Sequence, residues 1–296
     1  VSSSDSETLM NNAELALRQS QQKISVTWTQ YTQKLEKRTR TDIATALKLR
    51  LALEREELMV YYQPKVNLKS GNPIAAEALL RWYHPEIGFI PPGDFIPLAE
   101  QNQLIGPIGE WVLRKACRDL NIWKNAGFDV LPIAVNVSLV QFQLSNMPEV
   151  VHKALTDYDI RADQIILEIT ESVFEEFDNN LRDDLDKLHT MGIKLSLDDF
   201  GTGYSSLGHL KDYPFDEIKI DKSFIWQLDD GGYGEAIVKA VEAIALAIDA
   251  QVVAEGIESI DHANALKGLG CTVGQGFYYS KPMPEDQWQK QMWTKK

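Results

Sequence analysis

The chain has 296 residues, 44% of them hydrophobic, which is enough for a sizeable core in one large domain or two small ones. Its formal net charge of −13 argues against broad, sequence-independent nucleic-acid binding, which depends on a positive field. Only two distant cysteines and no apolar run of ~18–20 residues are present, which argues against a disulfide framework, a zinc site and membrane contact.

The first sixty residues are predicted to be mostly helical. Two stretches carry helical periodicity, at 11–25 and 41–57, and apolar residues recur through the second from Ile43 onward. We therefore divide the chain into an N-terminal helical segment, residues 1–40, and a main domain, residues 41–296.

From residue 58 onward, short apolar runs alternate with longer amphipathic stretches. Strands are predicted at 59–63, 74–78, 133–137, 165–169, 193–197, 217–220, 251–254 and 272–277. Helices are predicted between them at 109–125, 181–191, 234–248 and 260–269, and Asp94 is predicted to cap another. This alternation predicts a single α/β domain with a parallel sheet, and roughly eight strands over ~250 residues favour a (β/α)8 barrel of the TIM type. A doubly wound open sheet is the alternative, but no glycine-rich phosphate loop follows the first strand.

Most of the predicted strands end in a polar or charged residue. In chain order these residues are Glu77, Asn136, Glu168, Asp198 with Asp199, Lys219, Glu255 and Gln275. Most of their separations match one strand-plus-helix unit, and the long first gap has room for two. Because the carboxyl ends of barrel strands converge on one mouth, we expect these side chains in a single pocket. One such residue alone is usually solvated or salt-bridged, so the recurrence is what indicates a site.

The crowding of five carboxylates in that pocket predicts bound cations, since like charges raise one another's pKa and the cost of burial. The ligands are all oxygens, which favours magnesium or manganese over zinc, and the adjacent Asp198 and Asp199 allow a second ion. Two such ions can clamp the attacking and leaving oxygens of a phosphodiester displacement. Lys219 would activate the attacking water or neutralise developing charge, and Arg81 would take a phosphate bidentately. The residues therefore predict a metal-dependent hydrolase of a phosphoester and leave its substrate open.

The sequence around these positions resembles the EAL-domain family of cyclic di-GMP phosphodiesterases. The naming triplet is Glu77-Ala78-Leu79, and the further blocks, in family order, are YYQPKVNL, NVS, LEITES, DDFGTGYSSL, IKIDKSF, VAEGIE and GQGFYYSKPM. The resemblance covers about residues 45–290. It implies a modified TIM-type barrel, hydrolysis of cyclic di-GMP to linear pGpG, two magnesium or manganese ions, and a homodimer.

The resemblance also implies roles for single residues. The metal ligands would be Glu77, Asn136, Glu168, Asp198, Asp199 and Glu255. The catalytic residues would be Lys219, Gln275, Glu255 and Glu171. The substrate-binding residues would be Gln63, Arg81 and Asp221. Among the catalytic residues, Lys219 and Gln275 would position the attacking water, and Glu171 would anchor the DDFGTGYSSL loop, which in the family supports the second metal and dimerisation.

Two alternative functions are weighed against an active enzyme. The first is a catalytically silent cyclic di-GMP receptor that signals to a partner; the absence of substitutions at the implied positions favours the enzyme. The second is another phosphodiester-hydrolysing barrel, such as a glycerophosphodiesterase. That reading would place histidines at strand ends, and the five histidines of this chain do not follow that pattern.

The N-terminal segment, residues 1–40, weakly resembles the last helix of a GGDEF domain, and an ordinary linker helix is the alternative. Because the chain starts at Val1, we expect it to be a fragment, so its parent could carry a membrane anchor outside this sequence. The chain itself is expected in the cytoplasm.

Overall fold

The computed structural model describes residues 10, 13, 17, 30–174, 179–202, 207–228 and 232–293. Its strands are β1 (Leu58–Asn67), β2 (Pro73–His84), β3 (Gly88–Ile90), β4 (Ile133–Asn136), β5 (Ile165–Thr170), β6 (Lys194–Phe200), β7 (Glu217–Ile220), β8 (Gln251–Ala254), β9 (Val273–Gly274) and β10 (Met283–Pro284). Its helices are α2 (Gln33–Ala52), α3 (Pro92–Gln101), α4 (Ile105–Asn125), α5 (Leu139–Leu144), α6 (Met147–Tyr158), α7 (Asn179–Thr190), α8 (Leu207–Leu210), α9 (Lys222–Trp226), α10 (Tyr233–Ala247), α11 (Ile260–Leu269) and α12 (Glu285–Trp293), with 3-10 turns η1 (Ala162–Gln164) and η2 (Glu171–Phe174).

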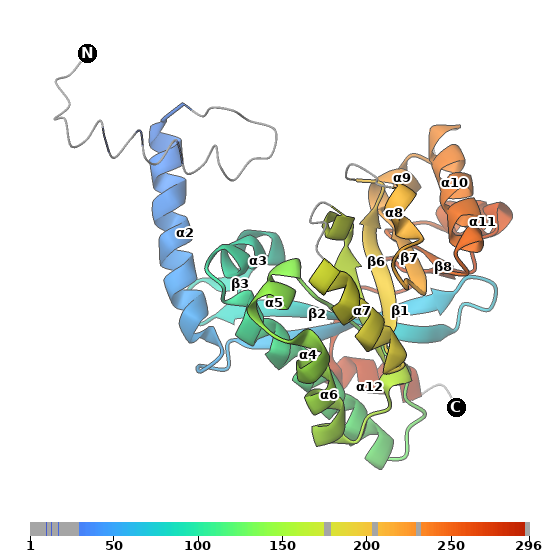
Figure 1. The fold of residues 1–296 in the computed structure, drawn as a ribbon, viewed down its shortest axis with the longest axis horizontal. Coiled ribbons are helices and arrows are strands. Elements are labelled where there is room, and N and C mark those ends of the chain that lie inside the picture. The colour runs from blue at the N-terminus through green and yellow to red at the C-terminus, as the bar shows by residue number, and fades with distance from the viewer. Residues whose placement is uncertain are drawn as a thin grey trace.

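The sheet closes into a barrel, and Figure 1 shows helices flanking its strands. The strand order is β10-β1-β9-β8-β7-β6-β5-β4-β2-β3, and an additional β1–β2 pairing closes the ring. The predicted TIM-type barrel is therefore confirmed. Helix α2 lies at one side of the barrel and packs against α3.

Strand β1 departs from the predicted all-parallel sheet, because it runs antiparallel to both of its barrel neighbours, β2 and β9. Only a short turn joins β1 to β2, with Gly71 at a φ of +72°. A turn of this length cannot contain the crossover helix that a parallel pair needs. The register of the hairpin sets Gln63 opposite Glu77.

Several smaller predictions need correction. The long gap between β2 and β4 holds β3, α3 and α4, so no second barrel unit is inserted there. Asp94 does not cap a helix: α3 begins at Pro92 with Pro91 at its N-cap, and Asp94 lies in the first turn, where its charge suits the helix dipole. Helix α2 ends at Ala52, before the predicted end at residue 57. The predicted helix at 11–25 lies almost entirely outside the described residues.

The inward-facing side of the barrel is built in layers. Ala75, Ala134 and Ile166, on neighbouring strands, form a small apolar cluster. Side chains alternate along a strand, so the next inward positions toward the carboxyl ends are Glu77 and Glu168, together with Asn136. The outward positions of β5, for example Leu167, are fully buried in the main core beneath the helices. A buried apolar strand that carries one inward acid is therefore the local pattern that presents a charged side chain to the mouth.

Within the described part of the chain, no helix combines the length and the apolar character needed to cross a membrane.

Candidate active site

Lys219 lies at the centre of the polar layer and is 1% exposed. Its Nζ lies 3.0 Å from Glu168 Oε2, 3.0 Å from Asp198 Oδ1, 2.7 Å from Glu255 Oε1 and 3.8 Å from Glu77 Oε1. Four carboxylates from strands that are far apart in the sequence therefore converge on one ammonium group, as the sequence predicts. The predicted strand at 74–78 is too short, however, because β2 continues to His84 and Glu77 lies within it rather than at its end.

Amide side chains complete the wall of the site. Asn136 Nδ2 donates to Glu77 Oε1 at 2.7 Å, and Gln275 Nε2 donates to Glu77 Oε2 at 2.6 Å. Gln275 Nε2 also lies 3.0 Å from Gln63 Oε1, and Gln63 in turn donates to the Ser280 carbonyl at 3.0 Å. Gln275 Oε1 is buried with no hydrogen-bond partner among the described residues. This acceptor is therefore free to bind a water molecule or another donor that enters the site.

Lys65 is a second buried ammonium group in this layer, and the sequence reasoning missed it. It comes from β1, is 1% exposed, and its Nζ lies 2.8 Å from Glu168 Oε1. It also contacts Glu217, which accepts a hydrogen bond from Ser196 Oγ at 2.8 Å. Glu168 is thus held by an ammonium on each carboxylate oxygen. One feature of the sequence could have indicated Lys65 as a site residue: it follows Gln63 by two residues and therefore lies on the same face of a buried strand.

The charges around Lys219 are unevenly balanced. Burial, together with the negative charge of Glu168, raises the pKa of Glu77 to about 8, and burial likewise raises that of Glu255 to about 7. Burial would also raise the pKa of Glu168, but Lys219 and Lys65 outweigh it and lower that pKa to about 2. Lys219 and Lys65 therefore neutralise Glu168, whereas Glu77 and Glu255 are left with excess negative charge around them.

Asp198, Asp199 and Glu255 offer carboxylate oxygens that all lie within 4.8 Å of one another. Asp199 has a φ of +56°, and its amide donates to Asp198 Oδ1 at 2.9 Å. Burial and the adjacent Asp198 charge raise the pKa of Asp199. An all-oxygen group with excess negative charge fits a hard divalent cation such as magnesium or manganese.

The loop after β6 is tied to the site by Glu171, which is 6% exposed. Its Oε2 accepts a hydrogen bond from the Gly201 amide at 2.9 Å. Gly201 has a φ of +94°, and a Cβ there would lie 2.8 Å from the Phe224 ring, so any other residue would strain the backbone and displace that ring. Residues 203–206 of the predicted loop lie outside the described residues.

Two expected substrate-binding residues lie at the edge of this set. Arg81 shares the Glu77 face of β2 but is turned toward Tyr61, with its guanidinium 5.7 Å from that ring centre. Asp221 lies beyond the end of β7, so it does not share a strand with Lys219; it caps α9 by accepting from the Ser223 amide at 2.9 Å.

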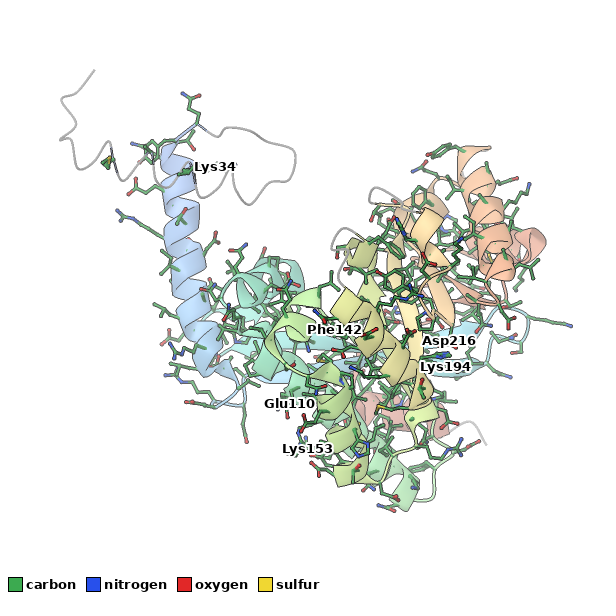
Figure 2. All side chains as sticks on the ribbon, in the orientation of Figure 1. Lys34, Glu110, Phe142, Lys153, Lys194 and Asp216 are labelled. Carbon is green, nitrogen blue, oxygen red and sulfur yellow. The ribbon has the colours of Figure 1, made fainter. Side chains whose placement is uncertain are left out.

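A pocket of about 360 Å³ opens onto this layer, lined by Gln63, Glu77, Leu79, Asp198, Lys219, Lys222, Trp226, Glu255, Gly256, Glu258, Gln275, Gly276 and Phe277. Lys194 and Asp216, labelled in Figure 2, lie at the opposite ends of the strands, because Lys194 begins β6 and Asp216 directly precedes β7. Asp216 accepts from the Leu195 amide at 2.9 Å, which is a structural role.

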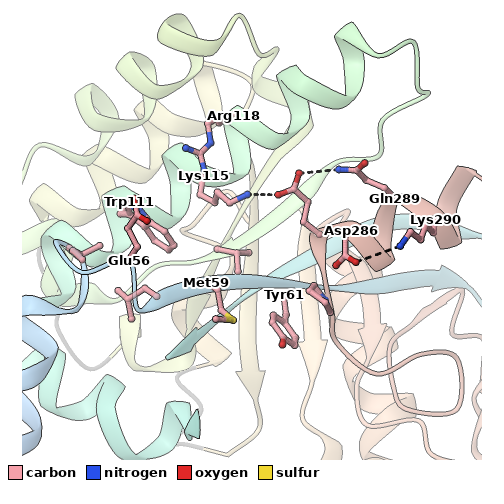
Figure 3. A pocket seen from close by; sticks show the side chains of 14 residues that line it. Glu56, Met59, Tyr61, Trp111, Lys115, Arg118, Asp286, Gln289 and Lys290 are labelled. Atoms are coloured by element: carbon pink, nitrogen blue, oxygen red, sulfur yellow. Dashed lines mark hydrogen bonds and ion pairs between the residues drawn. The ribbon is translucent and has the colours of Figure 1, made fainter. Parts of the chain in front are cut away.

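A larger cleft, about 810 Å³, lies outside β1 near α4 and α12 (Figure 3). Four of its charged groups are paired within the wall: Lys115 Nζ lies 2.7 Å from Glu285, and Lys290 Nζ lies 3.7 Å from Asp286. Among the described residues, the acids that converge closely enough to hold a metal ion are Asp198, Asp199 and Glu255, which belong to the smaller pocket's layer, so that pocket is the candidate active site despite its size.

Several known proteins are similar to this chain in sequence and in fold. A family model for the EAL domain matches residues 46–282. The bifunctional diguanylate cyclase/cyclic di-GMP phosphodiesterase MucR of Pseudomonas aeruginosa is 45% identical over 240 residues, which cover 81% of this chain and 35% of MucR. The oxygen sensor protein DosP of Escherichia coli is 37% identical over 239 residues, 81% of this chain and 30% of DosP. A solved structure of the PaMucR phosphodiesterase in complex with c-di-GMP has a TM-score of 0.79 at 43% identity, covering 83% of this chain and 99% of that chain. The chain spans about a third of the length of the curated relatives it matches.

Proposed function

This chain belongs to the EAL-domain family, and we propose that it is an active phosphodiesterase that hydrolyses cyclic di-GMP to linear pGpG. The observation that carries the proposal is the convergence of four carboxylates on the buried Lys219 ammonium. This arrangement has more negative charge than its lysines compensate, which a purely structural ion-pair cluster would not need.

Metal binding is part of the proposal. Glu77, Asn136, Glu168, Asp198, Asp199 and Glu255 would hold two magnesium or manganese ions. These ions would supply Lewis-acid stabilisation of the phosphate and lower the pKa of bound water. The raised pKa values of Glu77 and Glu255, to about 8 and about 7, support a cation at this position, because burial and the neighbouring carboxylates raise these values more than Lys219 lowers them.

The chain's own residues would do the remaining work. Lys219 would donate a hydrogen bond to the attacking water and oppose the charge that develops on the phosphate. Gln275 would orient that water through Oε1, its buried acceptor without a partner among the described residues. Glu255 would fix Lys219 Nζ, which lies 2.7 Å from its Oε1. Gln63, Arg81 and Asp221 would hold the substrate around this centre.

Assembly and location are further parts of the proposal. Glu171 would couple the loop after β6 to the second metal and to a homodimer interface, which the hydrogen bond to the Gly201 amide supports. The cytoplasmic location and the division into residues 1–40 and 41–296 stay predictions.

The decisive experiment is incubation with cyclic di-GMP and magnesium, followed by chromatography for pGpG. We expect pGpG from the wild-type chain and a large loss of turnover in Lys219→Met, with cyclic di-GMP binding largely retained. Binding without any pGpG would overturn the enzyme and support the silent receptor instead.

A further inference from the structure

Lys65 contacts one oxygen of Glu168, and the proposed chemistry assigns no role to this contact. The Lys65 ammonium lies 2.8 Å from Glu168 Oε1, and both side chains are buried. The other oxygen, Oε2, lies 3.0 Å from Lys219 Nζ. The two oxygens of this carboxylate therefore have different ammonium groups as partners and different surroundings.

Oxygen Oε2 of Glu168 lies on the side of the other acids of the site. Its partner Lys219 also lies 3.0 Å from Asp198 Oδ1 and 2.7 Å from Glu255 Oε1. Asp198 and Glu255 belong to the group of carboxylates that are close enough to one another to hold a cation. An ion bound beside them would therefore meet Glu168 through Oε2.

Oxygen Oε1 faces a different layer of the barrel, closer to the amino ends of the strands. Lys65 also forms an ion pair with Glu217, which accepts a hydrogen bond from Ser196 Oγ at 2.8 Å. In the sheet, Ser196 is the neighbour of Glu168 on one side and of Glu217 on the other. Glu217 precedes Lys219 by two residues on the same face of β7, so this network lies beneath Lys219. Lys65 is thus fixed by a second acid and holds Oε1 away from the mouth of the barrel.

We infer that Lys65 is a positioning residue that restricts Glu168 to a single metal-facing oxygen and thereby makes the site select magnesium over calcium. The inference rests on the metal-binding part of the proposed function. Calcium takes roughly six to eight oxygen ligands and accepts both oxygens of one carboxylate, whereas magnesium requires a compact, near-ideal octahedron. A carboxylate with one oxygen held by a buried ammonium suits the smaller ion, because it offers the remaining oxygen in a fixed direction.

The test compares magnesium and calcium binding to chelator-treated protein by isothermal titration calorimetry, in the wild type and in Lys65→Met/Glu217→Leu. This double variant removes one positive and one negative charge, so the net charge of the layer is unchanged and no unpaired ammonium is left buried. With Oε1 released, Glu168 can bind calcium through both oxygens and loses its fixed direction toward magnesium. We expect the calcium Kd divided by the magnesium Kd to fall by about ten-fold or more.

A matched control removes a different ammonium group from the same pocket. Lys222 lines the pocket, and its Nζ lies 5.7 Å from the centre of the Trp226 ring. Lys222→Met changes the electrostatic attraction for both ions alike, so both Kd values should shift together and their ratio should stay as in the wild type.

Thermal melts with and without each ion show whether each variant is folded and provide a second readout of binding. If the double variant does not fold, Lys65→Gln carries the test, because a neutral amide cannot pair the charge on Oε1 and the ratio should fall in the same direction. An unchanged ratio in a folded variant would overturn the inference, and the hydrolase proposal would stand as long as the wild type forms pGpG. If the wild type binds neither ion, the metal part of the proposed function fails and the inference fails with it.

Discussion

Lys65 contacts the Glu168 oxygen that Lys219 does not, and it links Glu168 to Glu217 within the buried charge network. Lys65→Met would leave Glu217 and Glu168 buried with less positive charge, so we expect a loss of about 3–5 kcal/mol in the free energy of unfolding. The double variant Lys65→Met/Glu217→Leu removes both charges and should recover most of that loss. Urea unfolding of the metal-free protein measures both. Equal stability of the single variant and the wild type would show that Lys65 does not stabilise the buried carboxylates of Glu168 and Glu217.

The raised pKa values of Glu77 and Glu255 predict how the stability of the metal-free protein depends on pH. A carboxyl whose folded-state pKa is raised favours folding when protonated, so its contribution is lost as pH rises from about 4.5 through about 8 for Glu77 and about 7 for Glu255. The lowered pKa of Glu168, about 2, acts only below that window. For Glu77 the loss is up to about 5 kcal/mol.

Thermal melts in chelator between pH 5 and pH 8 test this expectation. The midpoint should fall as pH rises, and saturating magnesium should flatten the slope because it compensates the same carboxylates. Glu77→Gln should also flatten it while keeping the site's volume. A midpoint that rises steadily over this range in chelator would contradict the excess negative charge assigned to the pocket.

At the residue scale, the strand-end acids could be predicted because each follows an apolar run and breaks its pattern. Lys65 could not be recognised in the same way, since it lies inside a strand rather than after its end and its partner Glu217 is 152 residues away. The exposed Trp226 was missed for a related reason. Its position in the wall of the pocket depends on the close approach of α9 to Gly256, and no local pattern encodes that contact.

Among the elements, the loop after β6 is the one that links the proposed chemistry to assembly. Glu171→Ala removes the acceptor for the Gly201 amide, so the magnesium concentration for half-maximal turnover should rise about ten-fold, and the dimer should weaken. Glu171→Gln retains an acceptor oxygen and should behave much like the wild type. The exposed Glu149 provides a control through Glu149→Ala. Turnover against magnesium concentration and mass by light scattering measure the two effects, and unchanged curves for Glu171→Ala would refute the coupling.

Element positions followed from periodicity, whereas strand direction did not. The predicted strands at 217–220 and 251–254 coincide with β7 and β8, since each is a short apolar run bounded by turns. The sequence carries one indication that β1 is antiparallel, namely that the connection to β2 is too short for a crossover helix. The regular alternation of strands and helices after β2 favours a parallel sheet and masks this indication. Strand β9 ends at Gly274, before the predicted end at residue 277, because the chain then turns onto Ile257.

For the whole molecule, metal binding and stability should be linked. Ligands that bind only the folded state stabilise it, by about 2.7 kcal/mol for one site at a hundred times its Kd. Magnesium or manganese should therefore raise the melting temperature, and a chelator should reverse the rise and abolish turnover. Calcium should support little turnover, since its looser coordination suits the paired site less well. Full activity in chelator would refute the metal-dependent mechanism.

The barrel as a whole was predictable because repeated strand–helix units with acids at one end admit few arrangements. Whether residues 1–40 are a linker helix or the last helix of another domain could not be predicted, because both kinds of helix have the same periodicity.

The antiparallel β1 has a consequence for the order in which the domain forms. Its hairpin with β2 involves neighbouring residues and has a low contact order, whereas its pairing with β9 joins Val66 to Gly274 and must close a loop of most of the domain. During synthesis the hairpin can therefore form early, but the ring stays open until the last barrel strand has left the ribosome. Gln63 and Gln275, on the two sides of that seam, meet only at closure. A nascent chain would then acquire its candidate active-site pocket in the final step of folding, and truncation before β9 would abolish the pocket entirely.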